Sequence, residues 1–225
     1  MKIGEVNWYR SFLDELLEES RFEGLKKVLE PLGQAIEASD RRCREIEICY
    51  TDDNDEVSDQ ADDLFFEEDC LVEDLLGAAL VVSQCQIELV VTNLKKLDSY
   101  IRRNNQPFRF SFSLDRGDLV RMSPPESAQM QPTPVEVIES AGNLFKHGSQ
   151  WQGKWKSQTN NRNILALSSL GCVNSGVVYK NFQRITKYLG FKEKHDVRLL
   201  ESIIWEWVLH IHDLAYKDMK NSGLI

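Results

Sequence analysis

A carboxylate, an amide and an imidazole follow one another at intervals of four residues in the second half of the chain. They belong to Glu139, Asn143 and His147, and Lys146 stands beside them. In an α-helix this spacing places three side chains in one line along one face. Histidine changes its charge near neutral pH, so His147 suits proton transfer, with Asn143 orienting its ring. The alternative is an exposed histidine near a helix C-terminus, where a cation is stabilised in any case.

The helix that carries these side chains is predicted by its own start signal. Thr133 is a good N-cap, Pro134 suits the first helical position and Glu136 completes a capping box. We expect the helix to continue to about Gly148. Its apolar positions are Val135, Ile138, Gly142 and Phe145. Because these positions form another face, we expect the polar line to point away from the core, with the amide of Asn143 beside the imidazole ring.

The segment from Gly142 to Gly148, G-N-L-F-K-H-G, resembles the R-N-x-x-x-H-G segment of HEPN domains. These all-helical, often dimeric domains occur in toxin–antitoxin, CRISPR-associated and antiphage systems, and active members use the Arg and His as a metal-independent ribonuclease site. The resemblance implies that Asn143 and His147 match the motif Asn and His. The motif Arg falls on Gly142, which cannot stabilise a phosphate. The resemblance therefore implies a non-catalytic, HEPN-like accessory or binding protein of a bacterial defence or toxin–antitoxin-type system.

The charged residues are distributed unevenly along the chain. Residues 51–74 contain twelve Asp or Glu and no Lys or Arg, within a chain of net charge −9. Residues 141–198 contain ten Lys or Arg against two acidic residues, with aromatic residues between them. Because cations bind phosphates and aromatic rings stack on bases, this segment suits RNA or a nucleotide. The expected contacts are Lys154, Lys156, Arg162, Lys180, Arg184 and Lys187.

Three interpretations of the function stay open. In the first, the basic segment contacts RNA or a nucleotide, and a protein partner or a second copy completes the assembly. In the second, the chain is an endoribonuclease, with His147 as general acid or base and Lys146 or Arg162 holding the phosphate. In the third, the aromatic residues are core, the lysines solubilise the surface, and the protein is a helical interaction module without a nucleic-acid role.

The remaining patterns predict a mainly α fold, a helical bundle around a long central helix. The central helix is expected over about 58–103, because two apolar stripes give it a wide buried face. Residues 45–50 fit either a short strand or a helix end. Other helices are expected near 5–30, 133–148, 160–170, 179–189 and 195–219.

A small β-hairpin is expected to interrupt the bundle near residues 108–122. Apolar and polar residues alternate strictly from Phe108 to Leu114, and a turn signal follows at 115–118. The proline-rich stretch after it is a connecting loop. We therefore expect a single helical domain over 1–225 that contains this hairpin and connecting segment at 104–134.

Composition and missing motifs exclude several classes of protein. With 42% hydrophobic and 28% charged residues, the 225-residue chain is typical of globular proteins. Its five scattered cysteines predict no metal site, and no dinucleotide, P-loop, hydrolase or zinc-protease motif occurs, so no cofactor is expected. Residues 75–94 are apolar but contain Gln84, Gln86, Glu88 and Asn93, which favours a buried helix over a membrane span. We expect a cytoplasmic protein.

Overall fold

The computed structural model describes residues 3–49, 55–104, 107–124, 130–151, 155, 161–173 and 178–225. The described residues contain helices and no strand, so the prediction of a mainly α fold is confirmed. In chain order the helices are α1 Ile3–Asp14, the short 3₁₀ helix η1 Glu15–Leu17, α2 Glu19–Cys49, α3 Asp55–Arg103, α4 Arg116–Leu119, α5 Pro134–Trp151, α6 Arg162–Ser169, α7 Val178–Tyr188 and α8 Leu199–Asn221.

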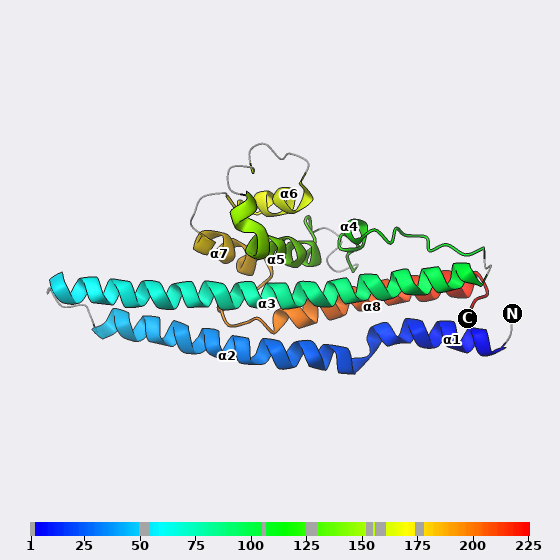
Figure 1. Cartoon of the computed structure of the whole chain (residues 1–225), viewed down its shortest axis with the longest axis horizontal. Coiled ribbons are helices and arrows are strands. Elements are labelled where there is room, and N and C mark those ends of the chain that lie inside the picture. The colour runs from blue at the N-terminus through cyan, green and yellow to red at the C-terminus, as the bar shows by residue number, and fades with distance from the viewer. Residues whose placement is uncertain are drawn as a thin grey trace.

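Helix α3 is the spine of the molecule and runs along its whole length (Figure 1). Helix α2 returns antiparallel to it, and together they form a long helical hairpin that extends beyond the other helices. Helix α8 lies along the C-terminal half of α3, away from the projecting tip of the hairpin. Helices α5, α6 and α7 form a second group, across α3 from α2. A helix with such neighbours needs a wide apolar face, as the two stripes predict.

The helix predicted over residues 5–30 is divided in the structure. Helix α1 ends at Asp14, η1 turns the chain, and α2 then continues to Cys49 with Pro31 inside it. The described part of 45–50 is therefore a helix end rather than a strand.

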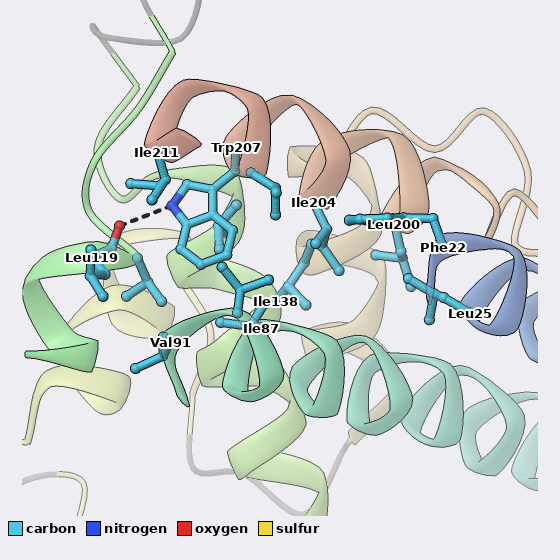
Figure 2. Close-up of a cluster of buried hydrophobic side chains, with 14 of the residues drawn as sticks. Phe22, Leu25, Ile87, Val91, Leu119, Ile138, Leu200, Ile204, Trp207 and Ile211 are labelled. Atoms are coloured by element: carbon cyan, nitrogen blue, oxygen red, sulfur yellow. Dashed lines mark hydrogen bonds between the residues drawn. The ribbon is translucent and has the colours of Figure 1, made fainter. Parts of the chain in front are cut away.

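The core is centred on Trp207 of α8, which is fully buried (Figure 2). Ile138 of α5 and Ile87 of α3 lie on one side of its indole, and its Nε1–H donates to the carbonyl of Leu119 at 2.9 Å. A buried indole needs such an acceptor, because an unpaired N–H costs about 1–3 kcal/mol. This hydrogen bond joins the short helix α4 to α8 and so to the bundle.

The predicted β-hairpin is wrong. Residues 107–115 form no strand, and α4 occupies the position of the expected turn. The alternation nevertheless predicts correctly which side chains face the core. Phe108 is buried, and the next three apolar side chains pack against the same core cluster. The carboxylate of Asp115 accepts a hydrogen bond from the N–H of Gly117 at 2.7 Å, so it caps a helix where a turn was expected.

One helix in the described part of the chain, residues 61–103 of α3, is long and apolar enough to cross a membrane. Of its most apolar 18-residue window, 56% is buried inside the molecule. The apolar surface of α3 is therefore largely used in packing against α2, α5 and α8, as expected for a central helix.

Candidate functional site

Helix α5 starts as the sequence predicts, but its first carboxylate has another partner. The hydroxyl of Thr133 accepts a hydrogen bond from the N–H of Glu136 at 3.1 Å and donates to the carbonyl of Val120. The carboxylate of Glu136 accepts hydrogen bonds from Nε of Arg162 at 3.0 Å and Nε of Arg121 at 3.3 Å. Half of the expected capping box is therefore replaced by ion pairs that join α5 to α6 and to the end of α4.

The line of Glu139, Asn143 and His147 does not point away from the core along its whole length. Glu139 is only 6% exposed, and its carboxylate is 2.6 Å from Nη2 of Arg116. The other Nη of Arg116 pairs with Glu88 of α3. The expectation that the whole line faces solvent is wrong for Glu139, because its carboxylate is buried against Arg116, which joins α4 to both α5 and α3.

The side-chain amide of Asn143 binds the carboxylate of this ion pair and not the ring of His147. Its Nδ2 donates one turn back, to Oε1 of Glu139 at 3.2 Å. His147 is half-buried and makes no hydrogen bond or ion pair with the described part of the chain, and Lys146 is exposed. Asn143 therefore does not orient the imidazole in this structure, and His147 has no acid–base partner among the described residues.

Gly142 lies where α5 packs tightly against α3. A Cβ atom on this residue would lie 3.0 Å from Oε1 of Gln84 and 3.2 Å from the carbonyl oxygen of Leu80. Gln84 is almost fully buried, and its Nε2 donates to the carbonyl of Glu139 at 3.4 Å. One helical turn along the crossing, the ring of Phe145 lies directly on Gly77. A side chain at the position that matches the motif arginine would therefore need Gln84 or the α3 backbone to give way.

Arg162, the first residue of α6, contacts the start of α5 and lies far from His147. Besides its ion pair with Glu136, its guanidinium lies against the backbone of Gly117. Glu136 precedes His147 by eleven positions on the same helix, which is about 16 Å along the axis. Arg162 is thus placed to neutralise a buried carboxylate, three turns from the imidazole.

Three of the expected RNA contacts lie together on α7. Lys180 and Lys187 are exposed and Arg184 is half-exposed, while Phe182 and Ile185 are buried beneath them. Arg184 also donates to the carbonyl of Gly171 at the end of α6. Lys154 and Lys156 lie outside the described residues. We call Lys180, Arg184 and Lys187 the α7 basic face.

A second cationic surface, which the sequence analysis did not select, lies at the other end of the molecule. Lys96, Tyr100 and Arg103 are exposed on the last turns of α3, and Trp8 of α1 stacks on Tyr100. We call these four residues the basic–aromatic stripe. The spacing of four and three residues along α3 is a signal that was available in the sequence, whereas the contact with Trp8 arises only on folding.

A pocket of about 310 Å³ opens between α5, the end of α7 and α8. Among the described residues that line it, Glu206 alone carries a charge. The hydroxyl of Thr133 is used in capping, and that of Tyr188 donates to the carbonyl of Pro132. Burial, with the negative charge of Glu136, raises the pKa of Tyr188, which keeps this phenol protonated as a donor. The pocket therefore offers no converging set of reactive groups.

No group of three or more His, Cys, Asp or Glu residues in the described ranges is arranged to hold a metal ion. Cys172 is buried, and this burial raises its pKa to about 11, so the thiol stays protonated at neutral pH.

Protein-family models, curated proteins and solved structures were each compared with the chain, and none of them matches it. The resemblance of the Gly142–Gly148 segment to HEPN domains therefore stays a prediction. Only the geometry of the chain then bears on its function.

Proposed function

We propose that this chain is a non-catalytic binding protein, HEPN-like and accessory to a bacterial defence or toxin–antitoxin-type system, that contacts RNA through the α7 basic face. The observation that carries the proposal is the position of two exposed cations and one half-exposed cation at i, i+7 and i+4 of one helix. Helix α7 contains no Asp or Glu. Its solvent-facing side is therefore positive although the chain as a whole has a net charge of −9.

The α7 basic face has the dimensions and donors for a phosphate backbone. Lys180 and Lys187 are about 10 Å apart along the helix axis, which lets them bind different phosphates. Arg184 gives one N–H to Gly171 and keeps other guanidinium donors for a ligand. Contacts of this kind bind nucleic acid without reading its sequence, because phosphates carry no sequence information.

The non-catalytic part of the proposal is supported by the surroundings of Gly142 and Asn143. The motif arginine position is closed by α3, and the amide that would orient the imidazole is bound to Glu139. A metal-independent ribonuclease needs a group that stabilises the phosphorane charge beside its acid–base residue. Lys146 is the nearest cation along α5, and it is exposed and makes no ion pair with a described residue that would hold it beside the imidazole.

The binding half is tested by measuring RNA affinity against salt concentration. We expect Lys180→Ala/Lys187→Ala to weaken binding and to reduce the slope of log K against log salt by about 1.4, since each phosphate contact to a single strand contributes roughly 0.7. Lys26→Ala/Lys27→Ala on α2 is the matched control, because α2 lies on the far side of α3 from α7 (Figure 1). Equal affinity and slope in the α7 variant and the wild type would refute the role of α7.

The non-catalytic half is tested by incubating structured RNA with the pure protein in EDTA. We expect the wild type and His147→Ala to leave the RNA intact to the same extent. Cleavage by the wild type that His147→Ala abolishes would instead establish the endoribonuclease. RNA binding that is absent at low salt would leave the protein–protein interaction module as the function.

A further inference from the structure

We infer that the basic–aromatic stripe binds single-stranded nucleic acid, with a base stacked on Tyr100 and its flanking phosphates on Lys96 and Arg103. The inference extends the proposed RNA-binding function to a second surface, at the opposite end of α3 from the α2–α3 hairpin tip. It concerns a different mode of contact, because the α7 basic face has cations and the stripe has both cations and exposed rings.

The aromatic part of the stripe is a close, tilted pair of rings that is partly open to solvent. The rings of Trp8 and Tyr100 have centroids 3.7 Å apart and an interplanar angle of 30°, and both residues are 38% exposed. The buried Tyr9 and the half-buried Phe12 support the pair from the inside, at 5.8 Å from Tyr100 and 5.1 Å from Trp8. Both residues keep more than a third of their surface exposed, so a base can add to this aromatic cluster from the solvent side.

The cations of the stripe are not used inside the molecule. Arg102 forms an ion pair with Asp98 at 2.9 Å, whereas Lys96 and Arg103 have no ion pair with any described residue. The helix dipole explains cations only in the last turn of a helix. Lys96 lies two turns before the end of α3, so the dipole does not account for it.

The positions of the three α3 residues match the order that a stacked nucleotide requires. Lys96, Tyr100 and Arg103 follow one another at spacings of four and three, so the ring lies between the two charges on one face of the helix. The two charges are about 10 Å apart along the axis. An unstacked base therefore meets the ring while the phosphates on each side of it meet a cation.

Comparing the affinity for single-stranded RNA with that for duplex RNA distinguishes this inference from the proposed role of α7. A duplex offers phosphates but no unstacked base, so only a single strand gains from the stripe. We expect Tyr100→Leu to weaken binding of a short oligouridine by roughly 5- to 100-fold and to leave the affinity for an RNA duplex unchanged. Lys180→Ala/Lys187→Ala should weaken binding of both ligands.

Matched variants keep the test independent of folding. Tyr100→Phe retains the ring and should bind oligouridine as the wild type does, and Arg103→Ala should weaken binding more than Arg102→Ala, whose guanidinium is held by Asp98. Lys96→Ala/Arg103→Ala removes only exposed groups and should also lose affinity for the single strand. If oligouridine binds equally to the wild type, Tyr100→Leu and Lys96→Ala/Arg103→Ala, the inference is overturned, whatever the α7 variant does.

Discussion

At Gly142 any side chain would meet α3 at once. The nearest atoms are the buried amide of Gln84 and the backbone carbonyl of Leu80, and the carbonyl cannot turn away as a side chain would. Glycine in a helix costs about 1 kcal/mol relative to alanine. The close approach of α5 to α3, with the packing that it allows, is what offsets this cost.

Replacement of Gly142 by the motif residue should therefore destabilise the protein. We expect Gly142→Arg to lower the free energy of unfolding by at least about 3 kcal/mol, because it overpacks the crossing and buries a charge. The control is Gly24→Arg on α2, where no atom lies within 4 Å of the added Cβ, and it should be neutral or slightly stabilising. Urea denaturation measures both. Equal midpoints for the two variants would mean that the crossing has room for a side chain.

The candidate site could be predicted from the sequence only as far as local spacing reaches. The Thr133 cap and the common face of Lys180, Arg184 and Lys187 follow from positions within one helix, and the structure has both. The partner of Glu139 is Arg116 from α4, which no local pattern connects to α5. For that reason a buried, paired carboxylate was mistaken for the first member of an exposed line.

At the scale of elements, the turn between α7 and α8 fastens the α2–α3 hairpin. The ammonium of Lys194 lies 3.3 Å from the carboxylate of Asp40 in α2 and 3.4 Å from that of Asp69 in α3. Asp196 holds this turn by accepting hydrogen bonds from the backbone N–H groups of Glu193 and Lys192. These hydrogen bonds hold the pKa of Asp196 below its usual value, so the turn stays anchored at neutral pH.

Removing this fastening should loosen the projecting part of the hairpin and leave the core intact. We expect Lys194→Met to raise amide hydrogen exchange several-fold in residues 35–47 and 61–75, while exchange in residues 87–101 stays as in the wild type. Lys26→Met, which removes only an ion pair with Glu23 within α2, is the control. Hydrogen-exchange mass spectrometry resolves these segments. Unchanged protection of the hairpin in Lys194→Met would show that the helices hold one another without the turn.

The helices could be predicted more fully than their connections. Two apolar stripes define α3, and a heptad that includes Trp207 defines α8, because each is a long periodic pattern. The alternation at 107–115 is a weaker signal. It predicts that one side of the segment is buried, but it does not predict whether a partner strand lies beside it. Asp115 caps α4 at the position of the expected turn, so the chain forms a short helix there instead of a hairpin turn.

At the scale of the whole molecule, the two groups of helices differ in what they leave exposed. The α2–α3 hairpin projects freely and has exposed apolar side chains, including Phe66 at 69%, among its acidic residues. The opposite end of α3 has the basic–aromatic stripe, and the α7 basic face lies on the second group (Figure 1). The surfaces proposed to bind RNA are thus separated along α3 from the acidic end of the hairpin.

This arrangement makes α3 a long electric dipole. Its first twenty residues contain ten acidic side chains and no Lys or Arg, and its last ten contain four cations. These charges far exceed the half charges of the peptide dipole, and they have the opposite sign at each end. At low ionic strength the field reaches about 30 Å, so an approaching polyanion exerts a torque that turns the acidic tip away before the surfaces touch. Added salt would shorten that reach and remove the preferred angle of approach.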